Sequence, residues 1–402
     1  MIYLDNASTT PVRREVIEVM MSFWSINFGN PSSITKIGVL AKQEIEKART
    51  VIATYLSRLP KEIIFTSGGT ESNNLAIFGV VKSLANKGIK ISNMHFISTN
   101  IEHSSITECF NELEKQGATV DYLKVKETGI IDSRDLRKMI KPNTVLISIG
   151  YANNEIGTIQ PIREISKEVR YARKTNKIII DKNEEEMGLY PYFHTDASQA
   201  GLYLNLNINE LGVDLMTLDA QKIYGPKGVG ILFKKTNVKF SPIILGGGQE
   251  GGLRSGTENV PLIAGQAKAF ELVRKSFERN AQKIKIIRDY FWQKIQKEIP
   301  EAILNGDLEN RLPNNLNISI PGINSEFTVL CLDEEGIVCS TKSACNHDED
   351  SSFVVRALGR DNVLAKSSLR FTLSENINKK NIDYVVSKLK NVIKKQLKQN
   401  FN

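Results

Sequence analysis

Cysteine is scarce in this chain of 402 residues. The four cysteines stand at positions 109, 331, 339 and 345, and none of them belongs to a CxxC pair. A structural zinc site or a disulfide-stapled fold is therefore not expected. No hydrophobic run approaches the ~20 residues that a membrane-spanning helix needs. The first residues, MIYLDNASTTP, also lack the basic and apolar regions of a secretory signal. These absences predict a cytoplasmic protein with reduced thiols, no membrane contact and no metal site.

A large excess of one charge is also missing. The formal net charge of +8 is compatible with an anionic partner such as RNA. It is more typical of a lysine-rich solvated surface, so we expect no direct contact with nucleic acid. The chain is long for one hydrophobic core and shows no internal repeat or low-complexity linker. We therefore expect two closely joined domains.

Short apolar runs alternate with helical patterns through the first two thirds of the chain. The runs are EIIFTS (62–67), MHFIST (94–99), TVLISIG (144–150), YFHTD (192–196), VDLMTLD (213–219) and VGILFK (229–234). This alternation predicts an α/β fold in which βαβ units form a mostly parallel, buried sheet. Polar residues follow several runs directly, at the edge where open α/β sheets bind their ligands.

The last third of the chain has a different pattern. A helical pattern from about Asn259 to Ile299 precedes a smaller α+β unit. We expect a docked surface helix at the end of this unit, because its last segment has one apolar stripe. The stripe consists of Ile382, Val385, Val386, Leu389, Val392 and Ile393. Residues 177–193, with an acidic centre, predict an inserted surface loop or hairpin, and a partner-docking element is the alternative.

Three features at predicted strand ends together suggest pyridoxal phosphate (PLP) as the cofactor. Asp196 in HTDASQ can pair with a protonated pyridine nitrogen, and Gln199 follows in the same turn. Lys222 supplies an amine that can bind the cofactor covalently and act as a base. In TSGGTESNN (66–74), the amides of Gly69 and Thr70 can hold a phosphate at a helix start. Each feature alone is commonly structural, but the ordered combination is much more specific.

Nearly end to end, the chain resembles the group I cysteine desulfurases, which belong to the class V aminotransferases among the fold-type I PLP enzymes. The matching segments are YLDNASTTP, FGNPSS, FTSGGTESNNLAI, IEHSSI, NNEIGTIQPI, FHTDASQ, KIYGPKGVG, GGGQEGGLRSGTENV, LNGD, NNLNIS, SAC, VVRALG and SSLRFTLS. The resemblance implies a large PLP-binding domain (14–258) with a mostly parallel seven-stranded sheet. Residues 1–13 and 259–402 would form the smaller α+β domain.

The resemblance also implies roles for the cofactor residues. Lys222 would carry PLP, Asp196 would pair with its pyridine nitrogen and Gln199 with its phenolic oxygen. Gly69 and Thr70 match the phosphate-binding turn.

Further matches concern the second subunit and the substrate. His103, in IEH, matches an imidazole that stacks on the cofactor ring and can move protons. Thr257, in RSGT, matches a phosphate contact from the other subunit, which implies a homodimer. Asn154 matches a contact of the ring oxygen and the substrate carboxylate, and Arg370 matches the arginine that clamps this carboxylate. Asn30, in FGNPSS, is a further candidate for substrate binding.

The segment SAC carries the expected sulfur chemistry. Cys345 matches the nucleophile that takes sulfur from L-cysteine as a persulfide, leaving L-alanine. The sulfur would pass to an iron–sulfur scaffold protein or to a tRNA-thiolation enzyme. Selenocysteine lyase, another class V reaction and an inert partner-binding scaffold are the alternatives. Cys109, Cys331 and Cys339 are interpreted as structural residues, with Cys331 in the core and Cys339 packed inward.

Two positions depart from the family pattern. Asp219-Ala220-Gln221 stands where Ser-Gly-His or Ser-Ala-His usually provides two phosphate contacts. Gln221 can still donate a hydrogen bond, whereas an ionised Asp219 would repel a phosphate. We therefore expect a local rearrangement at Asp219. Lys342 replaces a common glycine before SAC and could stiffen the loop or contact an acceptor protein.

Overall fold

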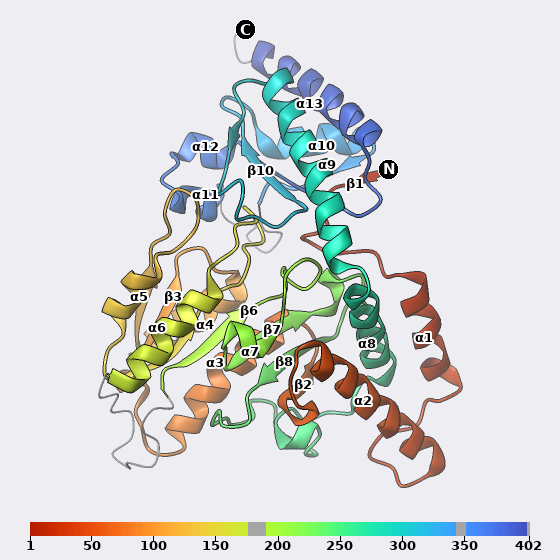
Figure 1. Ribbon diagram of the computed structural model, residues 1–402, viewed down its shortest axis with the longest axis vertical. Helices are drawn as coiled ribbons and strands as arrows, with labels where there is room; N and C mark the ends of the chain where they lie inside the picture. The colour runs from red at the N-terminus through yellow and green to blue at the C-terminus, as the bar shows by residue number, and fades with distance from the viewer. Residues whose placement is uncertain (176–189, 343–350, 400–402) are drawn as a thin grey trace.

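A computed structural model describes residues 1–175, 190–342 and 351–399 (Figure 1). Its centre is a seven-stranded sheet in the order β2-β8-β7-β6-β5-β3-β4. Strand β8 runs opposite to the other six strands, which are parallel to one another, so the predicted mostly parallel sheet is confirmed. The strands are β2 (Ile63–Thr66), β3 (His95–Thr99), β4 (Thr119–Leu123), β5 (Thr144–Ser148), β6 (Tyr192–Asp196), β7 (Leu215–Asp219) and β8 (Gly230–Lys234). Strand β4 had no counterpart among the predicted runs.

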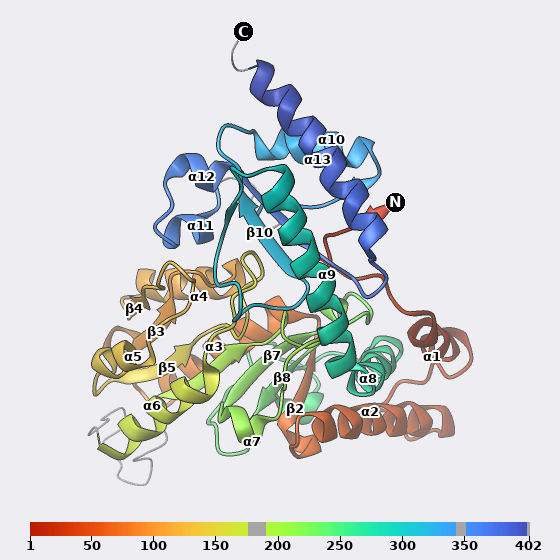
Figure 2. The same ribbon diagram turned by 45° about the horizontal axis from the view of Figure 1, so that its top comes forward.

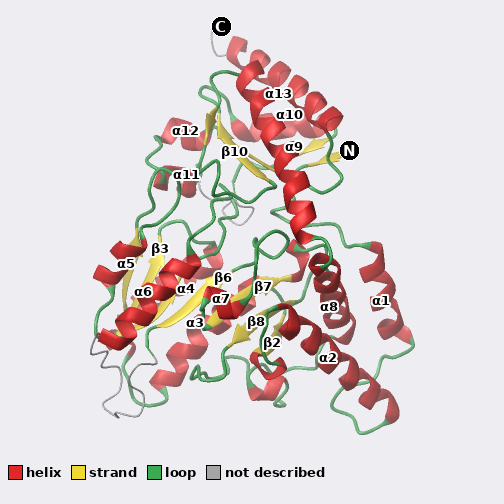
Figure 3. Ribbon diagram, viewed as in Figure 1, coloured by secondary structure: helices red, strands yellow, loops and turns green. Residues whose placement is uncertain are grey.

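Helices cover both faces of this sheet (Figure 3). One face packs against α3 (Gly69–Ala85) and α4 (Ser104–Lys115). The other face packs against α2 (Lys36–Tyr55), α5 (Ser133–Met139), α6 (Ile162–Thr175), α7 (Ile208–Leu211) and α8 (Val260–Arg274). Successive strand residues alternate between the two cores: Phe96 belongs to the first and Ile97 to the second. Burial on both faces explains why the strands appear in the sequence as continuous apolar runs.

The C-terminal unit contains a three-stranded antiparallel sheet in the order β12-β10-β9. Its elements are α9 (Phe277–Glu298), β9 (Ile303–Leu304), β10 (Asn315–Ser319), α10 (Ser325–Glu334), β11 (Ile337–Val338), α11 (Phe353–Ala357), α12 (Asn362–Lys366), β12 (Ser368–Thr372) and α13 (Lys379–Gln399). The chain start joins this unit, because β1 (Ile2–Tyr3) pairs with β11. Helix α13 buries the predicted stripe against α9 and α10, although Val392 is only half-buried.

The helical pattern over 259–299 is divided into two helices. Helix α8 ends at Arg274 and α9 starts at Phe277, because Ser276 has non-helical dihedral angles (φ −142°, ψ 0°). Helix α8 packs on α2 and on α1 (Arg14–Ser25), whereas α9 extends from α8 to pack on α13 and β10 in the C-terminal unit (Figure 2). The domain boundaries at 13/14 and 258/259 stay a prediction.

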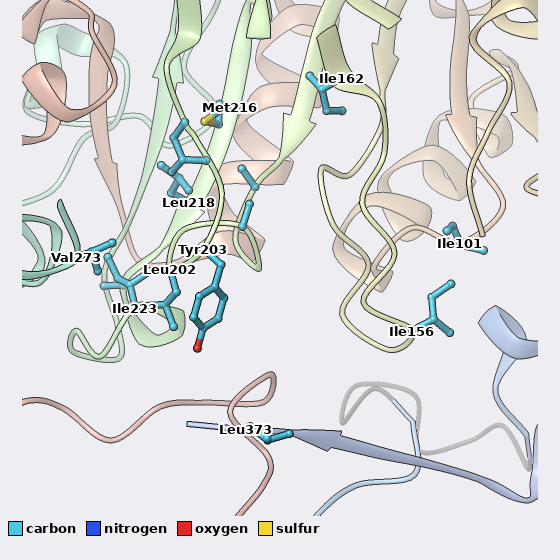
Figure 4. Packing of buried hydrophobic residues seen from close by; sticks show 14 of the residues in the cluster. Ile101, Ile156, Ile162, Leu202, Tyr203, Met216, Leu218, Ile223, Val273 and Leu373 are labelled. Atoms are coloured by element: carbon cyan, nitrogen blue, oxygen red, sulfur yellow. The ribbon is translucent and has the colours of Figure 1, made fainter. Parts of the chain in front are cut away.

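One apolar cluster continues from the large sheet into the C-terminal unit. Met216 and Leu218 of β7 lie in the same cluster as Val273 of α8 and Leu373, which follows β12 (Figure 4). This shared core keeps the residues that follow β6 and β7 next to those of the C-terminal unit.

The predicted surface insertion falls largely outside the described residues. Its last four residues, 190–193, are buried, which contradicts a surface location for them. Tyr190 and Tyr192 pack together with ring centroids 4.6 Å apart, and Tyr192 opens β6. Within the described ranges, no helix is long and apolar enough to cross a membrane.

Candidate active site

The carboxyl ends of the parallel strands meet at a cavity of about 210 Å³. Strands β6 and β7 contribute their last residues, Asp196 and Asp219, and the segments after β2, β3 and β5 contribute further side chains. The predicted residues that line the cavity are Gly69, Thr70, His103, Asn154, Asp196, Gln199, Asp219, Gln221, Lys222 and Arg370. Parallel strands bring their carboxyl ends to one edge, so residues that are distant in sequence converge there.

Lys222 reaches across the cavity to the N-terminal segment. Its Nζ donates to the carbonyl oxygens of Ala7 (2.7 Å) and Ser8 (2.6 Å). Gln199 Nε2 also donates to the Ala7 carbonyl, at 3.0 Å. The segment YLDNASTTP therefore forms one wall of the site and holds both side chains beside the cavity.

A chain of hydrogen bonds connects Asp196 with His103. Asn73 Nδ2 donates to Asp196 Oδ2 at 2.7 Å and to Ser105 Oγ at 2.8 Å. Ser105 Oγ lies 2.9 Å from His103 Nδ1, and the backbone N–H of Ser105 donates to the same nitrogen at 3.2 Å. Because a backbone N–H can only donate, we assign the proton of neutral His103 to Nε2. Asn73 and Ser105 were not predicted as site residues; both stand inside the quoted segments without a distinguishing signal.

Arg370 on β12 is fully buried and is held by the N-terminal segment. Its Nη2 donates to Asp5 Oδ1 at 2.7 Å and to Ser8 Oγ at 2.8 Å, and its Nη1 donates to the Asn154 carbonyl at 3.1 Å. Among the described residues its Nε has no hydrogen-bond partner. The hydrogen bonds to Asp5, Ser8 and Asn154 use three of the five N–H donors of this guanidinium, and a buried guanidinium with donors to spare is suited to a small carboxylate ligand.

The turn from β2 into α3 has little room for side chains. Gly68 has a φ of 151°, which favours glycine, and a Cβ on Gly69 would lie 3.2 Å from Ser198 Oγ and 3.3 Å from Asp219 Oδ2. The Ser198 hydroxyl is buried and has no partner in the described parts of the chain. Backbone amides at the positive end of α3, beside an unused hydroxyl, fit an anionic group.

Asp219 is directed towards this turn, and the local rearrangement expected beside a bound phosphate stays a prediction. Its Oδ2 accepts from the Gly69 N–H (3.1 Å) and from Gln221 Nε2 (3.1 Å), while its Oδ1 accepts from the Gln221 N–H (3.1 Å). These three donors stabilise the inward orientation.

Glu102 is a fully buried carboxyl group on the cavity wall, and the sequence reasoning did not single it out. Burial raises its pKa to about 7, although hydrogen bonds from Thr99 and Gly150 act in the opposite direction. Gly150 N lies 3.0 Å from both carboxyl oxygens, and the Thr99 hydroxyl donates to Oε1 at 2.6 Å. Glu102 thereby ties the end of β3 to the end of β5.

The structure places Asn30 and Thr257 outside this cavity. Both are exposed, and Asn30 Oδ1 accepts from the Ser32 N–H at 2.9 Å. The assignment of Thr257 to a phosphate contact across the dimer and of Asn30 to the substrate stays a prediction.

Cys345 lies outside the described residues, but both flanks of its segment are fixed beside the cavity. Ser340 forms an antiparallel bridge with Arg370, and Ser352 Oγ donates to Glu155 Oε2 at 2.5 Å. Glu155 directly follows Asn154 of the cavity wall. Lys342 Nζ lies 3.8 Å from Glu326 Oε1.

None of the three described cysteines lines this cavity. Cys109 and Cys339 are buried, and burial raises the pKa of each thiol to about 12. Such thiols stay protonated near neutral pH and are poor nucleophiles. Cys331 is only half-buried, so its predicted core position is wrong; it lies on α10 among several exposed residues. No group of three His, Cys, Asp or Glu side chains in the described ranges could hold a metal ion.

The family model for aminotransferase class-V matches residues 2–385. A cysteine desulfurase IscS from Dictyoglomus turgidum is 43% identical over 395 residues, which cover 98% of this chain and 95% of the relative. The chain therefore belongs to the aminotransferase class-V family, and within it to the cysteine desulfurases.

Solved structures agree with this assignment. A NifS-like protein superposes with a TM-score of 0.86 at 33% identity, covering 98% of this chain and 99% of the other. A structure of SspA in complex with cysteine has a TM-score of 0.76 at 34% identity, with 93% and 99% covered. The predicted family, fold class and enzyme class are thus confirmed.

Proposed function

We propose that this protein uses PLP bound at Lys222 to convert L-cysteine to L-alanine, with Cys345 as the acceptor of the sulfur. The observation that carries the cofactor assignment is the convergence of Asp196, Gln199 and Lys222 on one cavity beside the anion-binding turn of α3. Most of the donor set therefore fits PLP, and Asp219 is the exception. When bound, PLP supplies an electron sink that lowers the barrier to removing the Cα proton of an amino acid.

The residues of this chain would bind and orient the substrate as follows. Arg370, which lines the cavity, would hold the carboxylate, with Asp5 fixing the guanidinium plane. The Asn154 carbonyl further restrains Arg370. L-cysteine is the substrate that the complex of the related SspA supports.

Two side chains on the cavity wall would transfer protons during the reaction. Lys222 Nζ can take the Cα proton once its amine is released, and His103 Nε2 can hold or deliver a second proton. The hydrogen bonds through Ser105 fix the orientation of His103, and Asn73 connects this pair to Asp196. Such a fixed orientation keeps the imidazole in one position during proton transfer.

The sulfur transfer would occur on the segment between Ser340 and Ser352. The Cys345 thiolate attacks the substrate sulfur, so an S–S bond forms while the Cβ–S bond breaks. The bonding pair stays with the three-carbon fragment, which takes up a proton and leaves as alanine. The enzyme keeps a persulfide, which it passes to an acceptor: an iron–sulfur scaffold or a tRNA-thiolation enzyme. A cytoplasmic location fits either acceptor and stays a prediction.

A homodimer is the assembly that the surface supports. Large apolar side chains are exposed on α1, on the loop to α2, on the first turns of α2 and near residue 245. They include Trp24 (56% exposed), Phe28 (67%), Ile34 (98%) and Leu245 (72%). Surfaces of this kind commonly mark interfaces between proteins. The second copy would bring Thr257 to the site.

The test uses purified protein reconstituted with PLP. We expect a visible absorbance band, and release of equimolar alanine and sulfide from L-cysteine with a reducing thiol. Lys222→Ala should abolish the band, whereas Cys345→Ser should keep it and lose the persulfide. Colourless protein that stays inactive with added PLP would instead indicate an inert scaffold. Turnover of selenocysteine alone would indicate a selenocysteine lyase.

A further inference from the structure

The first turn of α3 already binds an acidic group of the chain itself. Asp219 Oδ2 lies 3.1 Å from both Gly69 N and Gln221 Nε2, which are two of the donors assigned to the cofactor phosphate. The Asp219 side chain is nearly fully buried, at 7% exposure of the residue. An ionised carboxylate is an acceptor only, so it takes the same hydrogen bonds that a phosphate oxygen would take.

A phosphate dianion cannot simply be added beside this carboxylate. Both groups would be acceptors without a proton between them, and like charges at short distance repel strongly where water is excluded. The carboxyl group is held in the turn, because Gly69 N–H, Gln221 N–H and Gln221 Nε2 all donate to it. A proton shared by the two oxyanions lowers their charge repulsion. It also supplies the missing donor, since a protonated carboxyl group donates one hydrogen bond.

We propose that Asp219 makes phosphate binding in this pocket dependent on the uptake of one proton, an inference that rests on the proposed PLP function. The carboxyl oxygen takes the proton from solvent, and the new O–H donates to a phosphate oxygen. The pair then carries a charge of about −2 in place of −3, because a phosphate monoester is mostly a dianion above about pH 6. Gly69 N–H and Gln221 Nε2 are released to the phosphate.

Other charged groups around the pocket do not replace this proton. Lys222 donates to the carbonyls of Ala7 and Ser8, and Glu71 on the first turn of α3 pairs with Arg254. Arg370 pairs with Asp5. The remaining titratable groups on the cavity wall are Glu102, His103 and Asp196. These groups are the same in the native protein and in any variant at position 219. A difference in phosphate binding between the native protein and such a variant therefore reports the effect of Asp219.

The experiment compares PLP with pyridoxal, which lacks the phosphate, as ligands of the full-length protein. Equilibrium dissociation constants are measured by absorbance between pH 6.5 and 8.5 for the native protein and for Asp219→Asn. Asp219→Ser is a second variant in case the first does not fold, and Asp135→Asn on the surface of α5 is the matched control. The ratio of the pyridoxal constant to the PLP constant reports what the phosphate contributes to binding.

For Asp219→Asn we expect this ratio at pH 8 to exceed the native value at least tenfold. Above pH 7, the ratio for the native protein divided by the ratio for the variant should fall by about tenfold per pH unit. Calorimetry in two buffers should detect the uptake of about one proton when the native protein binds PLP, and no uptake in the other combinations of protein and ligand. Equal ratios and equal pH slopes in native and variant protein would overturn the inference and leave PLP binding intact. Failure of both ligands to bind either protein would overturn the proposed cofactor as well.

Discussion

The buried carboxyl group of Glu102 should make the free energy of unfolding depend on pH. Burial raises the pKa of this carboxyl group from 4.5 to about 7. The folded state therefore binds more protons than the unfolded state between these values, and the stabilising contribution of Glu102 is lost as pH rises through this window. At 1.36 kcal/mol per pKa unit, the change amounts to about 3 kcal/mol. Glu102→Gln cannot titrate, so it should remove this part of the pH dependence.

The effect is large enough to measure by thermal unfolding. An unfolding entropy of about 2.1 cal/mol/K per residue gives ~0.8 kcal/mol/K for the whole chain, so ~3 kcal/mol corresponds to ~4 °C. We expect the Tm of Glu102→Gln relative to the native protein to rise by ~4 °C between pH 5 and pH 8. Glu108→Gln, on the exposed face of α4, serves as the control and should show no such trend.

An infrared measurement separates this effect from a general change in stability. A protonated carboxyl stretch should be present in native protein at pH 6 and absent in Glu102→Gln. Parallel Tm curves for the two proteins, together with no loss of that band in the variant, would refute the assignment of a raised pKa to Glu102.

Three further predictions concern the cavity and the surface. Arg370→Lys should raise KM for L-cysteine by roughly tenfold or more with cofactor absorbance unchanged, because the planar donor geometry is lost; an unchanged KM would exclude carboxylate binding by Arg370. Asn73→Leu should alter the pH profile of kcat/KM by breaking the connection from Asp196 to His103, whereas Asn74→Leu, on the same turn, should not; identical profiles would contradict a positioning role. Phe28→Glu should convert dimers to monomers in sedimentation velocity, and a dimer that persists would place the interface elsewhere.

The strands were predicted well because their burial on both faces leaves continuous apolar runs. EIIFTS, MHFIST and YFHTD all contain strands of the large sheet. TVDYL, the edge strand β4, was missed because half-buried residues interrupt its apolar character. The break between α8 and α9 was missed because the apolar periodicity continues past Ser276, and only the local dihedral angles there separate the two helices.

The candidate site was predicted only where its residues belong to recognisable sequence motifs. Lys222, Asp196 and His103 belong to motifs with recognisable chemistry, and the structure brings them to one cavity. Asn73, Ser105 and Glu102 act through side-chain contacts across elements that are up to 123 residues apart, as for Asn73 and Asp196. Nothing local in the sequence distinguishes such residues from ordinary helix and turn residues.

The sequence alone determined the alternation of strands and helices and the chemical groups at the strand ends, because these depend on local periodicity and residue type. Tertiary structure decided which of these groups meet. It placed the N-terminal segment against Lys222 and Arg370, and it directed Asp219 towards Gly69 rather than away from it. The orientation of a buried carboxyl group depends on which donors surround it, and those donors come from separate parts of the chain.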